Sequence, residues 1–239
     1  MIEIILFFEN EGAYIQLVTV ETRELLRLSG VSFGYKPDYL LFHDFSLAMA
    51  QGESVIISGQ IGSGKTTLVN LIIGRLKPYF GDLFIQGRSM DKLSGSDHAK
   101  LLAGWGMILE DNTLLFDRSV WENITTSIRL SATRIRPQRR DIDSLLRLFG
   151  LVEKRKRNPA TLSKGEQKLV QLIMACVRNP TLLIWDNPDD ALDKPAFLKA
   201  MDLVRRKHLT GTSVIIATSR PQDYSYLQWR NINIESKGR

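Results

Sequence analysis

The chain has 239 residues, of which 44% are hydrophobic and 24% are charged, and its formal net charge at neutral pH is +6. This composition predicts a globular domain large enough to bury a full core. It excludes a membrane-spanning helix, because the longest apolar runs fall far short of about 20 residues. The single cysteine, Cys176, lies in an apolar stretch with helical periodicity, which favours a packing role over a disulfide or a metal site.

The opening of the chain is predicted to be mostly antiparallel β-structure. Residues 1–22 alternate apolar and polar side chains in two runs around Glu9-Asn10-Glu11-Gly12, which predicts a hairpin and a separate N-terminal β extension. Three further strand-like stretches follow, and the last of them is a short and mostly apolar run. Strands are therefore expected, in chain order, at 2–8, 14–20, 25–35, 40–50 and 54–57.

A glycine-rich segment follows the last of these strands and precedes an apolar-periodic segment at 68–76. It reads Ser58-Gly59-Gln60-Ile61-Gly62-Ser63-Gly64-Lys65-Thr66-Thr67 and contains the pattern G-x-x-x-x-G-K-[ST]. Its glycines let backbone N–H groups turn toward a polyphosphate, Lys65 reaches the terminal phosphates, and the Thr66 hydroxyl ligates magnesium. The helix N-terminus that follows favours anions. The segment therefore predicts a phosphate-binding loop for a nucleotide.

The remainder of the chain alternates strands and helices. Strands are expected at 81–86, 105–109, 181–185 and 213–218, and helices across 119–158, at 165–178 and at 194–209. This alternation predicts a mostly parallel sheet with helices on both faces. The predicted fold class is therefore α/β, with a P-loop NTPase core, an antiparallel β subdomain and an inserted α-helical subdomain at about 112–180.

Basic residues concentrate in this helical subdomain, where ten of them lie between Arg129 and Arg157. Such a cluster is typical of surfaces that bind nucleic acid or an anionic membrane. The stretch lacks the aromatic interleaving that base stacking requires. We therefore interpret it as a solvated basic surface, and no nucleic-acid partner is expected.

The strand expected at 181–185 ends in Asp186. A carboxylate at the carboxyl edge of a parallel strand can hold magnesium. A buried strand that ends in aspartate is common in itself. Its position in the chain after a phosphate loop favours the magnesium interpretation.

Between these two motifs, Leu162-Ser163-Lys164-Gly165-Glu166-Gln167 opens a helix. With these three motifs in this order, the chain resembles the ATP-binding subunits of ABC transporters, whose signature is L-S-G-G-Q. The resemblance covers residues 23 to about 225 and implies an ABC-type nucleotide-binding domain at 23–239. Within the family, the segment 114–124 is most similar to the cell-division and lipoprotein-release branch (FtsE-like and LolD-like), with phospholipid-trafficking importers second.

The resemblance also implies a set of ligands for Mg-ATP. The ring of Tyr35 would stack on adenine, and residues 189–193 would cross an interface between two ATP-binding domains. Each ATP would lie between the phosphate loop of one domain and the signature of the other, and Mg²⁺ would be held by Thr66, Glu110 and Asp186. The expected nucleotide-binding residues are Tyr35, Gly59, Gln60, Ile61, Gly62, Ser63, Gly64, Lys65, Thr66, Thr67, Ser163, Gly165 and Glu166.

Three catalytic positions depart from the family pattern. Asn187 stands where the family has its general-base glutamate, Ser219 where it has its switch histidine, and Glu110 where it has a glutamine. Loss of a positioned general base typically costs about 10²–10⁴-fold in rate, and a carboxylate at 110 brings negative charge near the γ-phosphate. We therefore expect ATP binding with weak or absent hydrolysis, with Glu110 or Asp190 as the alternative base.

The resemblance implies an ATP-binding subunit of a membrane-associated ABC complex, at the cytoplasmic face of the membrane. Mg-ATP binding would drive dimerisation with a second ABC ATPase chain, identical or different, and act on a separate integral membrane permease that contacts residues near 110–125. The alternative is a regulatory or scaffold module of a cell-envelope complex that binds ATP without transport. A soluble ABC-type protein acting on nucleic acid is disfavoured, because such proteins usually carry two ATPase halves in one chain.

Overall fold

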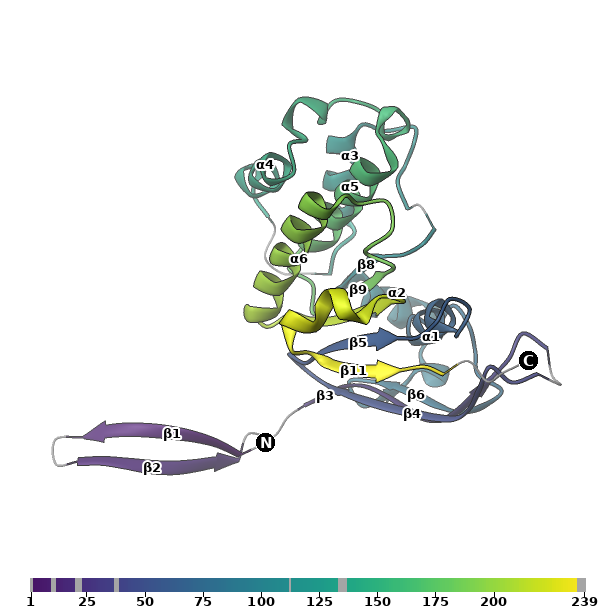
Figure 1. Cartoon of the computed structure of the whole chain (residues 1–239), viewed down its shortest axis with the longest axis vertical. Helices are drawn as coiled ribbons and strands as arrows, with labels where there is room; N and C mark the ends of the chain where they lie inside the picture. Colours follow the sequence, from purple (N-terminus) through teal and green to yellow (C-terminus); the bar gives the residue numbers. More distant parts are fainter. Residues whose placement is uncertain are drawn as a thin grey trace.

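The computed structural model describes residues 2–9, 12–19, 23–36, 39–111, 113–132 and 137–235, the first two ranges as backbone only. Its centre is a parallel sheet with the strand order β11-β5-β10-β9-β8, in which every neighbouring pair is parallel (Figure 1). The strands are β5 (Ser54–Ser58), β8 (Trp105–Ile108), β9 (Leu182–Asp186), β10 (Ser213–Thr218) and β11 (Arg230–Asn233). The predicted α/β class with a parallel sheet is confirmed.

The register of this sheet brings the ends of four strands to one edge. Ala217, near the end of β10, lies opposite Asp186 on one side and Ile57 on the other. On β8, Ile108 lies opposite Trp185. Because parallel strands end at the same edge, the segments that follow β5, β8, β9 and β10 emerge side by side.

A second, antiparallel sheet is built mostly from the strands expected near the start of the chain. Its order is β4-β3-β6-β7, with β3 (Glu24–Phe33), β4 (Phe42–Ala50), β6 (Phe80–Ile85) and β7 (Arg88–Ser89). Gly81, at the start of β6, has a φ of +84°, and a Cβ there would lie 2.4 Å from the carbonyl oxygen of Gly30. The close approach of β6 to β3 therefore requires glycine at this position.

The N-terminal strands β1 (Ile2–Glu9) and β2 (Gly12–Thr19) pair antiparallel, with Ile2 opposite Thr19. The expected turn residues Asn10 and Glu11 lie outside the described residues. The division of the chain into an extension at 1–22 and a domain at 23–239, with its helical subdomain at about 112–180, stays a prediction.

Most of the helices occupy the stretches that the sequence indicates. They are α1 (Lys65–Ile72), α2 (Gly95–Ala103), α3 (Val120–Arg129), α4 (Arg139–Leu148), α5 (Lys164–Cys176) and α6 (Lys194–Leu209), with 3₁₀ helices η1 (Met90–Lys92), η2 (Val152–Lys154), η3 (Pro159–Thr161) and η4 (Pro221–Leu227). Within the described residues, none of these helices is long and apolar enough to cross a membrane.

Two helical expectations were wrong in detail. The helix after the glycine-rich segment begins at Lys65 and ends at Ile72 rather than covering 68–76, because Gly74 has a φ of +73° and turns the chain away. No helix was expected between the strands at 81–86 and 105–109, where α2 lies. None of its residues is fully buried. Its Ser94 cap, which accepts from the N–H of Asp97, is a local signal for the start of the helix.

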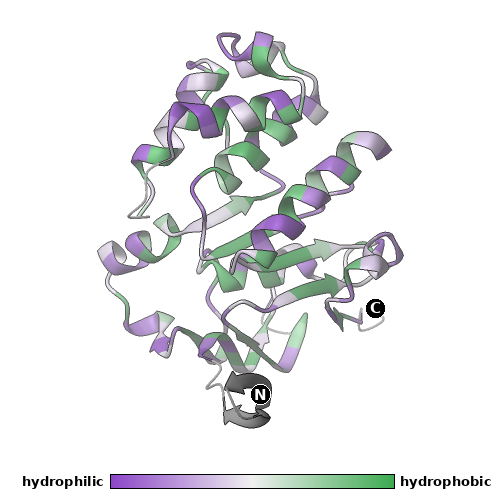
Figure 2. Ribbon diagram, turned by 90° about the vertical axis from the view of Figure 1, so that its left-hand side faces the viewer, coloured by the Kyte–Doolittle hydropathy of each residue, from purple (hydrophilic) through white to green (hydrophobic). Residues whose placement is uncertain are grey.

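Buried apolar residues pack against both faces of the parallel sheet, and the ribbon of its strands is coloured largely as hydrophobic in Figure 2. On β9, Leu183 and Trp185 pack with α3 to α6, whereas Leu182 and Ile184 pack with α1 and the antiparallel sheet. This alternation follows from the two-residue period of a strand. Cys176 lies buried in the first of these clusters, and burial raises the pKa of its thiol to about 12. Its predicted packing role is confirmed.

The segment between β8 and α3 is held by a buried amide. The side chain of Asn123 accepts from the N–H of Leu115 at 2.7 Å and donates to the carbonyl oxygens of Leu115 and Ser119, at 2.9 Å each. Asn123→Ala removes these bonds, and we expect it to lower the free energy of unfolding by about 1–3 kcal/mol. Urea denaturation measures this change. Asn231→Ala, on an exposed position of β11, is the control, and equal midpoints for the two variants would contradict the assignment.

Candidate nucleotide-binding site

A cavity of about 770 Å³ opens at the edge where the parallel strands end. This volume is in the range of small-molecule sites, which is roughly 300–1,000 Å³. Its walls come from the end of β3 and the turn after it, from the loop between β5 and α1, and from the segments that follow β8, β9 and β10. The lining residues are Tyr35, Lys36, Tyr39, Leu41, Ile61, Gly62, Gly64, Lys65, Thr66, Thr67, Glu110, Asn187 and Ser219.

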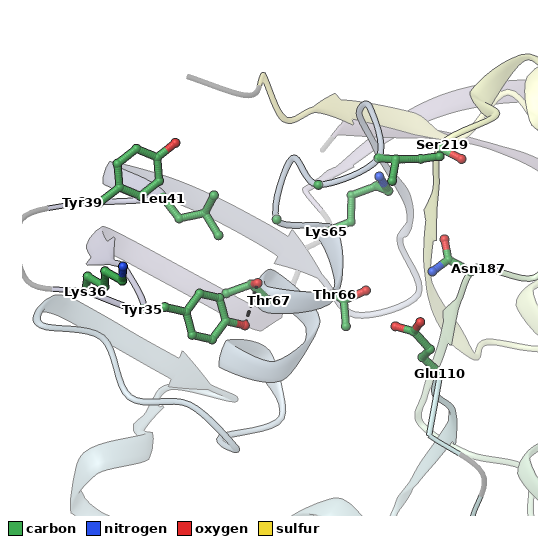
Figure 3. A pocket seen from close by; sticks show the side chains of 13 residues that line it. Tyr35, Lys36, Tyr39, Leu41, Lys65, Thr66, Thr67, Glu110, Asn187 and Ser219 are labelled. Atoms are coloured by element: carbon green, nitrogen blue, oxygen red, sulfur yellow. Dashed lines mark hydrogen bonds between the residues drawn. The ribbon is translucent and has the colours of Figure 1, made fainter. Parts of the chain in front are cut away.

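The two ends of the cavity differ in chemistry (Figure 3). Tyr35, Lys36, Tyr39 and Leu41 lie at one end, the phosphate-loop residues lie in the middle, and the three polar side chains from the sheet edge lie at the other. Of the residues at the aromatic end, only Tyr35 was predicted. The other three, Lys36, Tyr39 and Leu41, lie in or next to a segment that the sequence marks only as a connection between strands. The available signal for them was a second tyrosine, Tyr39, four residues after Tyr35.

Tyr35 is 69% exposed as a residue. Its hydroxyl forms a hydrogen bond with the Thr67 hydroxyl at 3.0 Å, and its ring meets Phe33 edge to face at 5.4 Å. These contacts fix the side chain while leaving most of its surface accessible. The ring is therefore placed where a flat base can stack on it.

Lys65 opens α1 and turns back over the phosphate loop. Its ammonium donates to the carbonyl oxygens of Gly59 and Gln60, at 2.8 Å each. Burial lowers the pKa of Lys65, and the carboxylates of Asp186 and Asp189 oppose that shift. Neutral carbonyl acceptors are weaker partners for an ammonium than an anion is. The geometry therefore suits Lys65 to bind a phosphate group in their place.

Gly59 and Gly64 have the positive φ angles that the loop needs. Their φ values are +156° and +102°, respectively. A Cβ at residue 59 would lie 2.4 Å from the carbonyl oxygen of Ile234 and 2.5 Å from the hydroxyl of Ser63. The loop thus packs closely against the rest of the sheet edge, and only glycine fits at residue 59.

The carboxylate of Asp186 lies behind the cavity wall, at the end of β9. The residue is 1% exposed, and within the described residues neither carboxylate oxygen has a hydrogen-bond partner. Burial raises the pKa of Asp186; the nearby Thr66 hydroxyl opposes this shift without reaching hydrogen-bond geometry, while the Glu110 carboxylate adds to it. A buried, unpaired carboxylate is unfavourable unless a cation offsets its charge.

Thr66, Glu110 and Asp186 together fit Mg²⁺, which takes hard oxygen ligands and is usually held by one or two carboxylates, water and substrate phosphates. No group of three or more His, Cys, Asp or Glu side chains in the described parts of the chain forms a metal site by itself. The two carboxylates and one hydroxyl would therefore hold the ion jointly with phosphate oxygens.

Replacing the buried carboxylate of Asp186 is expected to stabilise the nucleotide-free protein and to weaken its binding of Mg²⁺. A folded-state pKa raised above the unfolded value makes Asp186 destabilising at neutral pH, and this penalty disappears as the pH falls through the folded-state pKa toward the unfolded one. We therefore expect Asp186→Asn to raise the Tm of the nucleotide-free protein at pH 7. We also expect it to remove the additional Tm increase that Mg²⁺ gives in the presence of ATP. Thermal unfolding with ATP plus EDTA and with ATP plus Mg²⁺ measures both effects.

The control is Asp190→Asn, which changes an exposed carboxylate in the loop after β9. It should keep the magnesium-dependent increase in Tm. The same increase in the Asp186 variant as in the wild type would contradict the assignment of the metal ligand.

At the polar end, the cavity is lined by the three residues at the catalytic positions that depart from the family pattern, Glu110, Asn187 and Ser219. The N–H of Asn187 donates to the carbonyl oxygen of Ala217 at 2.9 Å, and its φ is +50°, a conformation that asparagine tolerates better than most residues. Ser219 directly follows β10. Of the two alternative bases, Glu110 lines the cavity, whereas Asp190 is not among the lining residues.

The signature residues lie outside this cavity, at the start of α5. Ser163 caps the helix by accepting from the N–H of Glu166 at 3.2 Å, and Glu166 accepts from the N–H of Ser163 at 3.0 Å. Glu166 also pairs with Lys154, which is the main cause of its lowered pKa. A Cβ on Gly165 would lie 2.6 Å from the carbonyl oxygen of Ala191. The capping pattern S-x-x-E was the signal for the two hydrogen bonds between Ser163 and Glu166.

The sequence of the chain matches the family described as ABC transporter over residues 42–190. It is 32% identical over 191 residues to the cell division ATP-binding protein FtsE of Streptococcus pneumoniae, across 80% of this chain and 83% of that protein. It is 33% identical over 175 residues to FtsE of Mycobacterium tuberculosis, across 73% of this chain and 76% of that protein. The resemblance to the cell-division branch is thereby confirmed.

Solved structures show the same fold. The dimeric structure of MJ0796, a bacterial ABC transporter cassette, superimposes with a TM-score of 0.77 at 23% identity, over 89% of this chain and 95% of that one. The ATP-binding subunit of another ABC transporter gives a TM-score of 0.75 at 22% identity, over 90% and 88% of the two chains. A phosphate loop, a buried aspartate at a strand end and a capped signature helix thus occur together on the ABC ATPase fold, and the chain belongs to the family of ABC transporter ATP-binding subunits.

Proposed function

We propose that this chain is the ATP-binding subunit of a membrane-associated ABC complex and that it binds Mg-ATP in the cavity described above. The observation that carries the proposal is the combination of a phosphate loop in the cavity wall with the buried, unpaired carboxylate of Asp186 beside it. Adenine would stack on Tyr35 at the aromatic end. The triphosphate would extend past Lys65, and its γ-phosphate would reach the polar end.

Weak or absent hydrolysis is the second part of the proposal. It is supported by Asn187 and Ser219, neither of which can accept a proton at neutral pH. Both line the polar end of the cavity, where the attacking water would have to be activated. The chain thereby combines intact binding elements with a deficient site for cleavage. ATP binding, rather than cleavage, would then be the step that this chain supplies.

Nucleotide-driven dimerisation is supported by the position of the signature. Ser163 and Gly165 start α5 outside the cavity of their own chain, so they are free to complete the cavity of a second ABC ATPase. That second chain is either a copy of this one or a catalytically complete ATPase. In the second case, this chain would provide its signature to the competent site of the partner.

A membrane permease is proposed to contact the segment before α3, near residues 110–125, with this chain at the cytoplasmic face. Leu115 and Phe116 expose apolar surface there. A neighbouring depression of about 550 Å³ is lined by Ser119, Trp121, Glu122, Arg139, Arg155 and Lys156. Apolar and basic side chains side by side suit a partner segment that is both amphipathic and acidic.

A regulatory or scaffold module that binds ATP without transport is the second candidate. The FtsE relatives from Streptococcus pneumoniae and Mycobacterium tuberculosis are named for cell division rather than for a transported substrate, and this observation favours it. In this case the complex would contain a membrane partner that does not form a transport pathway. The two candidates share the nucleotide site and differ in the partner.

Site-specific photocrosslinking in the native membrane tests the proposal. A photoreactive residue replaces Phe116 in one variant and Leu209, at the exposed end of α6, in the other. We expect crosslinks from position 116 to a multispanning membrane protein and none from position 209. A single-pass or peptidoglycan-linked partner would favour the second candidate. Crosslinks confined to position 209 would contradict the proposed contact.

A further inference from the structure

A polar cluster joins the loop after β9 to the loop after β10. The carboxylate of Asp189 accepts hydrogen bonds from the Thr218 hydroxyl at 3.1 Å, from the Tyr224 hydroxyl at 3.0 Å and from Nε of Arg220 at 2.5 Å. Nη2 of Arg220 also donates to the backbone carbonyl oxygen of Asp189 at 2.8 Å. These four residues are called the Asp189 cluster below.

The Asp189 cluster is charged and largely buried, and the carboxylate at its centre accepts hydrogen bonds from the other three residues. The Asp189 side chain is 11% exposed, and Thr218 and Tyr224 are buried. Burial alone would raise the pKa of Asp189, but the hydrogen bonds from Arg220 and Tyr224 outweigh it and hold the pKa below its usual value. The carboxylate is therefore ionised at neutral pH. Charge-assisted and bidentate hydrogen bonds of this kind have strict geometry, so they fix the two loops relative to each other.

Both loops carry a residue of the polar end of the nucleotide cavity. Asn187 lies two positions before Asp189, and Ser219 lies between Thr218 and Arg220. The backbone strengthens the same link, because the N–H of Asn187 donates to the carbonyl oxygen of Ala217 and the N–H of Arg220 donates to the Thr218 hydroxyl, at 2.9 Å in each case. Asn187 and Ser219 are therefore held as a single unit facing Lys65 (Figure 3).

We propose that the Asp189 cluster is a positioning device that makes the site select nucleoside triphosphate over diphosphate. The inference rests on the proposed function, because it assumes that the cavity binds a nucleotide. The side chains of Asn187 and Ser219 are neutral hydrogen-bond donors. Donors that are already held in place lose little conformational entropy when they bind a phosphate oxygen. In the proposed binding mode, the third phosphate is the one that would extend past Lys65 and meet them. Loosening the cluster therefore weakens triphosphate binding and leaves diphosphate binding nearly unchanged.

The test compares two arginines with the same kinds of partner. Arg220 and Arg230 are 50% and 46% exposed, and each pairs closely with a carboxylate and a backbone carbonyl: Arg220 with those of Asp189, Arg230 with the carboxylate of Glu53 and the carbonyl of Ala48. Arg220 also forms a more distant ion pair with Asp223, at 3.8 Å. Arg220→Met is expected to weaken binding of a non-hydrolysable ATP analogue with Mg²⁺ by about 10-fold and binding of ADP by less than about 2-fold. Arg230→Met should change neither. Isothermal titration calorimetry on the full chain measures all four affinities.

A merely structural role would lower the affinity for both nucleotides equally, and this result, or unchanged affinity for both, would overturn the inference. Absence of ATP binding by the wild type would overturn the proposed function itself. Should Arg220→Met fail to fold, Tyr224→Phe, which removes a single hydroxyl, decides the question. It should lower the ATP-to-ADP affinity ratio by about 3-fold, in line with the loss of one hydrogen bond, and an unchanged ratio would overturn the inference.

Discussion

Replacing Lys65 with methionine is expected to weaken ATP binding by at least about 100-fold, equivalent to about 2.7 kcal/mol. Among the described residues, the Lys65 ammonium donates only to carbonyl oxygens, those of Gly59 and Gln60, so the charge that it brings is available to phosphate. Burial lowers the pKa of Lys65, and a phosphate anion would restore the balance in favour of the charged form. Methionine has a similar length and no charge, so the variant removes the phosphate contact while retaining the packing of the side chain.

Equilibrium binding of a fluorescent ATP analogue measures this loss. The matched control is Lys77→Met, because the Lys77 side chain is exposed and forms a distant ion pair with Asp91, at 3.8 Å. That variant should bind ATP as the wild type does. If Lys65→Met lowers the affinity for ATP by less than about threefold, this result would contradict the proposed role of the phosphate loop in ATP binding.

Asn187→Glu is expected to raise the rate of ATP hydrolysis by about 10²-fold, the lower limit of what a positioned general base contributes. Residue 187 lines the polar end of the cavity, beside the loop whose lysine would hold the terminal phosphates. A glutamate there would supply the missing proton acceptor. Steady-state phosphate release by the assembled complex measures the change.

Backbone strain complicates the glutamate variant. Residue 187 has a φ of +50°, where glutamate costs on the order of 1 kcal/mol more than asparagine. Asn187→Gln is therefore the matched control, because glutamine has the same length and brings similar strain without the carboxylate. Equal rates for the two variants would show that Ser219 and Glu110 also block cleavage. Wild-type turnover of many ATP molecules per second would contradict the impaired site altogether.

The proposed separation of ATP binding from ATP cleavage has a structural rationale. Binding depends on backbone N–H groups, on the glycines that expose them and on the buried carboxylate of Asp186, all of which the fold itself requires or fixes. Cleavage depends on single side chains at the ends of β9 and β10, where Asn187 and Ser219 take positions that their neighbours hold by backbone hydrogen bonds. Substitutions there change the chemistry without disturbing the fold.

The sequence by itself determined the elements whose signals are local. Helix α6 (Lys194–Leu209) and strand β10 (Ser213–Thr218) have the predicted limits. The helix is signalled by the Asp193 cap and the periodic apolar residues after it, and the strand by a continuous apolar run. Each of these signals lies entirely within the segment that it predicts. The phosphate loop was equally readable, since its glycines and lysine act through the backbone of one short stretch. The aspartate that ends β9 was found through its place in the order of motifs.

Only the tertiary structure decided which segments share the site. Lys36, Tyr39 and Leu41 join the cavity because the antiparallel sheet places their turn beside the phosphate loop. The ion pair of Glu166 with Lys154 and the bonds of Asp189 with Arg220 connect residues from separate elements. No periodicity within a segment encodes such pairs, because each depends on how two segments pack. The sequence therefore specified a nucleotide-binding loop, and the packing of the sheet edge decided what surrounds it.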